Sequence, residues 1–328
     1  MIIDSGINYR VTEKTFVVVV CGPTASGKTE LAVRICERFG GEIIGADSMQ
    51  IYKGMDIATA KPTREELRGI THHMIDFLWP EEPFSVADYV NLARIKVDET
   101  RERGKLPVIA GGTGLYINSL IDNIEFPEIK GDHAFRADMQ ALAEEKGADF
   151  LLETLRESDP ETAAALHKNN LKRIIRALEV LHVTGGRKIS ELKRESRLNP
   201  TPYLPLMIQV DFPKPTLYER INKRTDKMLE RGLVEEARRF YSEHNARTAA
   251  QAIGYKELRP YLNGQAPLDE CVGNLKKSTR NYAKRQLTWF KKDTRIHRLE
   301  VDEENKECYF EKIFKKAENL IKKYGNFI

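Results

Sequence analysis

A glycine-rich segment that contains a lysine and a hydroxyl residue is the strongest chemical signal in this chain of 328 residues. Gly22-Pro23-Thr24-Ala25-Ser26-Gly27-Lys28-Thr29 has the spacing G-x-x-x-x-G-K-[ST] of a phosphate-binding loop. An apolar, β-branched run at Phe16–Val20 precedes it, and helical periodicity at Glu30–Phe39 follows it. We predict that backbone N–H groups and the helix N-terminus wrap an anion, that Lys28 reaches a terminal phosphate, and that Thr29 binds Mg²⁺. The motif leaves open whether the phosphates belong to ATP.

Two further segments place polar side chains where predicted strands end. Asp47 directly follows the strand candidate Glu42–Ala46, and Thr113 lies in the turn Gly111-Gly112-Thr113-Gly114 after Leu106–Ala110. Ligands of open parallel sheets bind outside the carboxyl ends of the strands, so both residues should lie near the phosphate loop. Asp47 is a candidate general base, or a metal ligand through water, and Thr113 can stabilise a departing phosphate. The strand Leu106–Ala110 lacks the Asp that closes the second nucleotide-binding strand of ATP and GTP hydrolases. This absence argues against ATP hydrolysis.

Positive charge gathers in two segments of a chain whose net charge is only +4. Residues 168–197 hold nine Lys or Arg against three Glu, and residues 276–298 hold nine against Asp293 alone. The two segments therefore carry +6 and +8. Either one could be a solvated helix face, but together they favour a polyanionic partner larger than one nucleotide.

Two predicted helices carry regular basic stripes. Thr216–Arg231 repeats Arg220, Arg224, Lys227 and Arg231 at three- and four-residue spacing, as a solvated face or as a clamp on a diphosphate. The helix 276–292 has an apolar face and a basic face. The basic face holds Lys277, Arg280, Asn281, Lys284, Arg285, Thr288 and Lys291, and the apolar face holds Tyr282, Ala283, Gln286, Leu287 and Phe290. Trp289 lies at the boundary, and we expect it to pack in the core rather than to stack on a base.

The order of the elements predicts an α/β protein with a helical insertion. Strand and helix signals alternate up to about residue 126, which is typical of a parallel sheet covered by helices. From 127 to 200 the pattern is helical only, and a strand signal returns at Leu206–Val210. We therefore predict a core formed by 1–126 and 201–328 and an insertion at 127–200. The predicted strands are Phe16–Val20, Glu42–Ala46, His73–Phe77, Leu106–Ala110, Leu206–Val210 and Arg295–Val301.

Composition excludes several classes of protein. No apolar run approaches the length of about 20 residues that a membrane helix needs, and the N-terminus lacks a signal-peptide pattern. The four cysteines have no metal-ligand spacing and do not suggest a disulfide framework. We expect a cytoplasmic monomer that makes no membrane contact.

These motifs together resemble the tRNA dimethylallyltransferase family, also called tRNA isopentenyltransferases, in its bacterial type without a Cys/His zinc finger. The similarity covers nearly the whole chain. The segments that carry it are Gly22–Thr29, Asp47–Pro62, Gly111–Tyr116, Arg176–Val180, Gly254-Tyr255 and Thr279–Phe290. The phosphate loop is generic, whereas the Asp47–Pro62 block and Lys284-Arg285-Gln286 are far more specific.

The resemblance implies a P-loop NTPase-like core with an insertion that grips the tRNA anticodon stem-loop. The implied reaction moves a dimethylallyl group from dimethylallyl diphosphate to the exocyclic amine of the adenosine beside the anticodon. Gly22–Thr29 would then hold the diphosphate rather than ATP, Asp47 would be the general base, and Thr113 and Arg224 would stabilise the leaving group. The implied tRNA contacts are Ser48, Met49, Gln50, Lys172, Arg173, Arg176, Arg280, Lys284, Arg285 and Gln286. Lys172 departs from the Gln that is commoner in the family.

Three other functions share parts of this pattern. A small-molecule kinase would use the same loop with ATP but would leave the basic segments and the insertion unexplained. A free-adenylate prenyltransferase would use the same chemistry without a tRNA-sized basic surface. An RNA-binding module with a degenerate nucleotide site would not need an intact Lys28, Thr29 and Asp47.

Overall fold

The computed structural model describes residues 14–126, 131–301 and 309–325, and they form two compact units. One unit runs up to Ile121 and resumes at Pro202, and the other comprises Asp122–Thr201. The sequence analysis placed these boundaries at 127 and 200. Within the described ranges, the structure has no helix that is both long enough and apolar enough to span a bilayer.

The first unit is built on a six-stranded sheet in the order β3-β2-β4-β1-β5-β6, in which every pair is parallel. The strands are β1 (Thr15–Cys21), β2 (Gly41–Ala46), β3 (His72–His73), β4 (Leu106–Gly111), β5 (Tyr203–Asp211) and β6 (Ile296–Glu300). The four valines Val17–Val20 of the central strand β1 are fully buried, because helices cover both faces of a parallel sheet. The predicted P-loop NTPase-like parallel sheet is confirmed.

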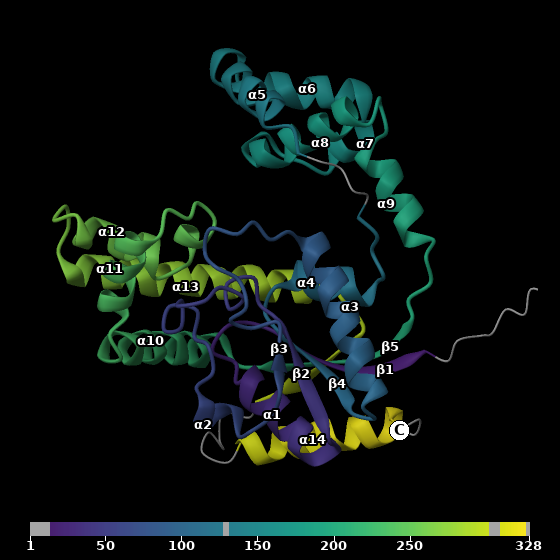
Figure 1. Ribbon diagram of the computed structural model, residues 1–328, viewed down its shortest axis with the longest axis vertical. Helices are drawn as coiled ribbons and strands as arrows, with labels where there is room; N and C mark the ends of the chain where they lie inside the picture. Colours follow the sequence, from purple (N-terminus) through teal and green to yellow (C-terminus); the bar gives the residue numbers. More distant parts are fainter. Residues whose placement is uncertain (1–13, 127–130, 302–308, 326–328) are drawn as a thin grey trace, which may run out of the picture. The chain divides into compact units, whose positions relative to one another are not determined.

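Helices α1 and α14 lie side by side against the sheet (Figure 1). Helix α1 (Lys28–Phe39) starts at Gly27 and ends at Gly40, both in the left-handed region that glycine favours. Its Arg34 pairs with Glu311 of α14 (Tyr309–Tyr324). Helices α3 (Val86–Glu102) and α4 (Gly114–Ile121) pack on each other and against β2 and β4. A short helix, α2 (Arg64–Leu67), precedes β3.

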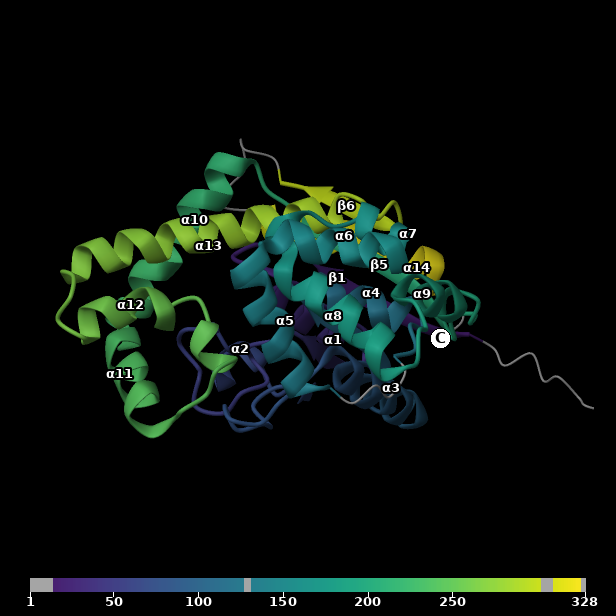
Figure 2. The ribbon, with the colours of Figure 1, turned by 90° about the horizontal axis from the view of Figure 1, so that it is seen from above.

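Four helices between β5 and β6 form the rest of this unit. Figures 1 and 2 show α10 (Lys214–Glu230) and α13 (Leu268–Phe290) side by side. Helix α11 (Leu233–Glu243) packs on α10, and α12 (Tyr255–Leu262) packs on α11 and α13. The 3₁₀ turn η2 (Ala249–Gln251) lies between α11 and α12 in the sequence. The two faces predicted for α13 are confirmed, since Ala283, Gln286 and Phe290 are buried while Lys284 and Arg285 are exposed.

The second unit is helical in its described residues. Its elements are α5 (His133–Lys146), α6 (Ala148–Ser158), α7 (Pro160–Ala164), η1 (Lys168–Asn170), α8 (Leu171–Val183) and α9 (Ile189–Arg197). Leu151, Leu155 and Ile174 form the centre of its own apolar core. The buried carboxylate of Glu179 ties α5 to α8.

The strand predicted at His73–Phe77 was wrong in extent. Only His72 and His73 pair with β2. Met74 and Asp76 have φ angles of 60° and 55°, and two such left-handed residues end an extended strand. The chain then follows another path, in which Asp76 N–H and Phe77 N–H donate to carbonyls of Gln50 and Ile51.

A buried carboxylate anchors the first residues of β2. Glu42 is only 3% exposed, and it accepts hydrogen bonds from Arg103 (2.5 Å), Lys105 (2.8 Å) and Thr100 (3.4 Å). His73 Nε2 also lies 2.7 Å from it. Burial raises the pKa of Glu42, but the bonds from Arg103, Lys105 and His73 outweigh it and bring the pKa down to about 2. This anchor fixes the strand whose other end positions Asp47.

We predict that Glu42→Gln lowers stability in a manner that depends on pH. A depressed carboxyl pKa stabilises the fold above the unfolded value of 4.5, and this contribution is lost as pH falls through about 2. Urea unfolding should therefore show a constant difference in the free energy of unfolding between the two proteins around neutral pH. This difference should shrink as pH falls from 4.5 to about 2. A difference of the same size at pH 7 and at pH 2.5 would contradict the role assigned to Glu42.

Candidate functional site

The phosphate loop leaves β1 and enters α1 with three residues in the left-handed region. Gly22, Ala25 and Gly27 have φ angles of 130°, 63° and 81°. The Ser26 hydroxyl donates to the Pro23 carbonyl (2.9 Å), and Lys28 Nζ donates to the same oxygen (2.5 Å). The loop is therefore closed by its own side chains, with Lys28 folded over it.

Gln286 of α13 ties the phosphate loop to the turn after β4. Its Oε1 accepts from Thr24 N–H, and its Nε2 donates to the Gly112 carbonyl, each over 2.9 Å. The side chain is 5% exposed. A Cβ at Gly112 would lie 2.2 Å from Gln286 Nε2, so a larger residue there would displace this amide. This geometry favours a role for Gln286 in holding the two loops rather than in contacting tRNA.

Two arginines of α10 reach the same loop from the other side. Arg220 Nε donates to the Ala25 carbonyl (2.9 Å), and Arg224 donates to the Thr24 hydroxyl. The Arg220 guanidinium lies over the rings of Phe212 (4.6 Å) and Tyr309 (5.7 Å). The arginine stripe of this helix therefore faces the loop at Arg220 and Arg224, and not only solvent.

The loop is strongly electropositive. Burial, and then the charge of Arg224, lower the pKa of Lys28 to about 8, although Asp47 opposes the shift. Burial also lowers the pKa of Arg224 to about 10, with Asp47 again opposing and Arg220 adding to the shift. Buried like charges disfavour their own protonated forms, and a bound anion would relieve this cost.

Asp47 stands at the carboxyl end of β2, half-buried, where the sequence placed it. Its Oδ1 accepts from the backbone N–H of Met49 (2.9 Å) and of Gln50 (3.4 Å). Among the residues that the structure describes, none donates a hydrogen bond to Oδ2. One oxygen thus fixes the carboxylate, and the other remains for chemistry.

Thr113 lies next to Asp47, although β2 and β4 are far apart in sequence. Its Oγ1 accepts from Ser48 N–H (3.0 Å), and its own N–H donates to the Ala46 carbonyl (3.0 Å). Tyr282 of α13 adjoins both groups: burial and Asp47 raise its pKa, and a hydrogen bond with Thr113 acts in the opposite direction. The sequence analysis assigned Tyr282 only to an apolar face, because nothing in the helical pattern shows what that face contacts.

The segment Asp47–Pro62 is held by polar side chains that the sequence analysis did not single out. Glu236 of α11 accepts from three successive backbone N–H groups, at Asp56, Ile57 and Ala58, over 2.7–2.9 Å. Buried Lys61 bonds Asp56 and Asp76. Gln50, one of the implied tRNA contacts, donates through Nε2 to the carbonyls of Thr59 and Ala60. A carboxylate on a distant helix gives no local signal, so only the fold reveals these anchors.

Three cavities meet at Arg224. A groove of about 540 Å³ runs over the phosphate loop and along the basic stripe of α10. A pocket of about 230 Å³ joins Asp47 to apolar side chains of Met228, Leu233 and Leu275. A cavity of about 80 Å³ beside Lys28 and Thr29 is lined by Asp47 as well. Arg224 lines all three, so an anion, an apolar group and the carboxylate can be brought together there.

His72 also lines the smallest cavity and was missed by the sequence analysis. Burial lowers its pKa to about 4, so the imidazole is neutral at pH 7. The described residues contain no cluster of three or more His, Cys, Asp or Glu side chains that could hold a metal by themselves. Thr29 lies in this cavity with Asp47 as its one carboxylate, a donor set that fits a cation retaining water or ligand oxygens.

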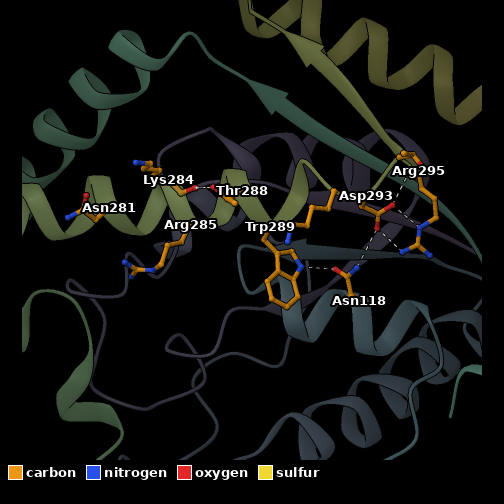
Figure 3. A pocket seen from close by; sticks show the side chains of 10 residues that line it. Asn118, Asn281, Lys284, Arg285, Thr288, Trp289, Asp293 and Arg295 are labelled. Atoms are coloured by element: carbon orange, nitrogen blue, oxygen red, sulfur yellow. Dashed lines mark hydrogen bonds and ion pairs between the residues drawn. The ribbon is translucent and has the colours of Figure 1, made fainter. Parts of the chain in front are cut away.

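The basic residues predicted to contact tRNA lie on two helices. On α13, Arg280 bonds Asn222 (2.7 Å), whereas Arg285 and Trp289 point to one side of the helix, and Lys284 to the other (Figure 3). On α8, Lys172 and Arg173 are exposed, and Arg176 pairs with Glu179 (2.5 Å). Trp289 is 42% exposed, so the expectation that it packs in the core was wrong.

Comparison with known proteins gives a consistent result. The model of the family described as IPP transferase matches residues 50–293. A protein of Acetivibrio thermocellus named tRNA dimethylallyltransferase is 48% identical over 314 residues, which are 95% of this chain and 99% of that protein. A solved full-length tRNA isopentenylpyrophosphate transferase of Bacillus halodurans is 39% identical, with a TM-score of 0.68 and coverage of 96% and 99%. A eukaryotic dimethylallyltransferase solved while acting on tRNA is 27% identical, with a TM-score of 0.80 and coverage of 94% and 80%.

We predict that anion binding at the phosphate loop takes up protons near pH 8. The pKa of Lys28 is about 8 in the free protein, and a bound anion raises it, so the fraction of neutral lysine is protonated on binding. Calorimetric titration with inorganic diphosphate in two buffers of different ionisation enthalpy measures this uptake. Diphosphate itself titrates in this pH range, so the uptake by Lys28 is the difference between the parent protein and Lys28→Met. This difference should be clear at pH 8 and absent at pH 6, where Lys28 is already charged. An equal difference at both pH values would contradict the assignment.

Proposed function

Because the chain belongs to the IPP transferase family, we propose that it is a tRNA dimethylallyltransferase. It transfers a dimethylallyl group from dimethylallyl diphosphate to the N6 amine of the adenosine on the 3′ side of the anticodon. The observation that carries this proposal is the meeting of an anion groove, an apolar pocket and the Asp47 carboxylate at Arg224.

The diphosphate of the donor binds at the phosphate loop. Lys28 bonds the Pro23 carbonyl and Arg224 bonds the Thr24 hydroxyl, so two cations stand at neighbouring residues of the loop. This arrangement suits an anion with charge spread over two phosphates. When the bond between the prenyl carbon and oxygen breaks, the leaving diphosphate gains negative charge. Lys28 and Arg224 stabilise that charge in a largely buried site, where electrostatic interactions are strong.

The prenyl group lies in the pocket lined by Met228, Leu233 and Leu275. This pocket has a volume of about 230 Å³, and Asp47 and Tyr282 line it as well. The apolar walls exclude water from the reacting carbon, and the carboxylate lies at the place where the adenine amine must arrive. The base leaves its stack to reach this pocket, at a cost of about a few kcal/mol.

Asp47 acts as the general base. As the N6 nitrogen forms its bond to the prenyl carbon, the proton of the amine passes to Oδ2 of Asp47 and the diphosphate leaves. Oδ1 stays bonded to the N–H groups of Met49 and Gln50, which holds the carboxylate in place. Thr113, fixed against Ser48, stands beside the carboxylate and can bond the leaving oxygen.

Mg²⁺ is the cation that this site suits. The Thr29 hydroxyl would hold it together with diphosphate oxygens and water, since Mg²⁺ usually keeps several waters and few protein ligands. When bound, it neutralises charge on the diphosphate. We propose that the protein acts as a monomer in the cytoplasm, where tRNA is decoded.

The other functions considered from sequence are not favoured. The relative of Acetivibrio thermocellus, which is named tRNA dimethylallyltransferase, is similar to this chain over 95% of its length. Strand β4, next to β1, ends in Gly111 where ATP hydrolases carry Asp. The tRNA backbone is therefore proposed to bind the exposed cations of α13 and of α8.

Asp47→Asn is expected to reduce prenyl transfer by about 10²–10⁴-fold while leaving donor and tRNA binding intact. Asparagine keeps an oxygen for Met49 and Gln50 but cannot accept the proton. Single-turnover transfer at saturating donor and tRNA measures the effect.

Asp47→Ala serves as the comparison, because it removes the turn bonds as well as the base. The two variants should lose transfer alike, while the alanine variant alone loses stability. A decrease of less than about threefold in the asparagine variant would exclude Asp47 as the base.

Replacing exposed cations is expected to weaken tRNA binding and flatten its salt dependence. Lys172→Ala with Arg173→Ala tests α8, and Lys284→Ala with Arg285→Ala tests α13. Each lost phosphate contact lowers the slope of log affinity against log salt by about 0.7–0.9. Titrations of tRNA at several salt concentrations measure the slope.

The control pair is Lys312→Ala with Lys315→Ala on α14, which removes the same charge elsewhere. It should leave the slope unchanged. Arg176 is kept, because its replacement would remove an ion pair from the buried carboxylate of Glu179 and could destabilise the fold. If the test pairs bind tRNA like the parent protein at every salt concentration, these helices do not contact the tRNA backbone.

A further inference from the structure

An exposed indole at the end of α13 lies outside the site described above. Trp289 is 42% exposed in a helix whose neighbouring Phe290 is fully buried. It lines a cavity of about 950 Å³, together with residues of α4 and of the segment after α13 (Figure 3). A large aromatic side chain left half in water requires an explanation, since burying it would stabilise the fold.

The indole is held rigidly rather than left to move. Its Nε1–H donates to Asn118 Oδ1 of α4 over 3.1 Å (Figure 3). A Cβ at Gly114 would lie 2.3 Å from Trp289 Cδ1, so the ring packs directly on the glycine backbone. The turn Gly111–Gly114 therefore gives space to two side chains of α13, Gln286 at Gly112 and Trp289 at Gly114. The bond and the glycine fix the indole before any ligand binds.

The cavity that holds the indole is lined by positively charged side chains. Lys284, Arg285, Lys292 and Arg295 all line the cavity. The one carboxylate in the lining, Asp293, is paired with Arg295 over 2.7 Å and also faces Asn118. A fixed aromatic face among cations is the arrangement by which proteins bind single-stranded nucleic acid, with the base stacked and the phosphate paired.

The cavity adjoins the reaction site, because Arg285 lines both this cavity and the Asp47 pocket. Tyr282, beside Asp47, and Trp289 are seven residues apart on α13. At about 1.5 Å per residue this separation is about 10 Å along the helix, the length of about three stacked nucleotides. A strand whose adenosine enters the Asp47 pocket can therefore extend along α13 to Trp289.

We propose that Trp289 is a base-stacking platform for an unpaired nucleotide of the RNA substrate, one to three nucleotides from the adenosine that reacts. Lys292 and Arg285 bind the phosphates on either side of that nucleotide. The proposal rests on the proposed function, because it takes RNA as the substrate. Stacking carries no base specificity of its own, so the platform contributes affinity and register rather than sequence readout.

The test uses the two tryptophans of the chain. Trp79→Phe leaves Trp289 as the sole indole, and Trp79 is remote from the cavity lining. Saturating anticodon stem-loop RNA should quench the fluorescence of this variant and protect it from acrylamide. Trp289→Phe, with Trp79 kept, is the matched control and should change little on RNA binding. If RNA binds and Trp289 stays fully accessible to acrylamide, the proposal is overturned.

A second measurement identifies the stacked nucleotide. Trp289→Ala should bind the stem-loop about 5- to 150-fold more weakly, with unchanged affinity for dimethylallyl diphosphate, and Trp289→Phe should recover most of the loss. In a series of stem-loops with one abasic loop position each, one RNA should bind parent and Trp289→Ala equally. If every abasic RNA shows the same difference between the two proteins, Trp289 acts through the fold and not through a base.

Prenyl transfer measured on the same RNAs separates this proposal from the proposed function. If the parent protein transfers the prenyl group while Trp289 shows no quenching or protection, the proposed function stands and the stacking role of Trp289 is excluded. If the protein binds the stem-loop and Trp289 is protected but no group is transferred, the stacking role stands and the proposed function is excluded.

Discussion

The site depends on one buried amide. Gln286 joins the N–H of Thr24 to the carbonyl of Gly112, and so couples the phosphate loop, the turn after β4 and helix α13. Each of these elements contributes a side chain to the site: Lys28, Thr113 and Tyr282 respectively. Because both ends of the amide are bonded and the side chain is buried, either loop can shift only by losing a hydrogen bond in a dry environment. The relative positions of base, donor site and basic helix follow from this bridge.

Electrostatics sets a second constraint on the site. Lys28, Arg220 and Arg224 converge on the loop, and Asp47 supplies the nearby negative charge. This arrangement is costly without an anion, as the lowered pKa values of Lys28 and Arg224 indicate. A site of this kind favours a ligand with more than one negative charge. In the proposed reaction the same surplus would stabilise the leaving diphosphate, so binding and catalysis would use the same side chains.

The glycines of the turn after β4 illustrate how packing and chemistry share residues. From sequence, this turn was predicted only to place Thr113 near a departing phosphate. In the structure, Gly111 faces the backbone of Ala46, Gly112 receives Gln286 and Gly114 receives Trp289. Thr113, between them, is thereby turned toward Ser48 and the site. The absence of Cβ atoms at Gly112 and Gly114 lets α13 pack closely on this turn, and this contact brings Tyr282 to Asp47.

The sequence by itself determined what is local. Motifs and periodicity predict the phosphate loop, the polar residues that follow β2 and β4, the two faces of α13, the helical segment and the family. Each of these features depends on residues close together in the chain. Tertiary structure alone decided that Glu236 fixes the segment after Asp47, that Gln286 is a bridge, that His72 lines the site and that Trp289 is exposed. These features arise between residues up to 262 positions apart, such as Thr24 and Gln286. Such contacts depend on which surfaces the fold brings together, and a helical or strand period cannot specify them.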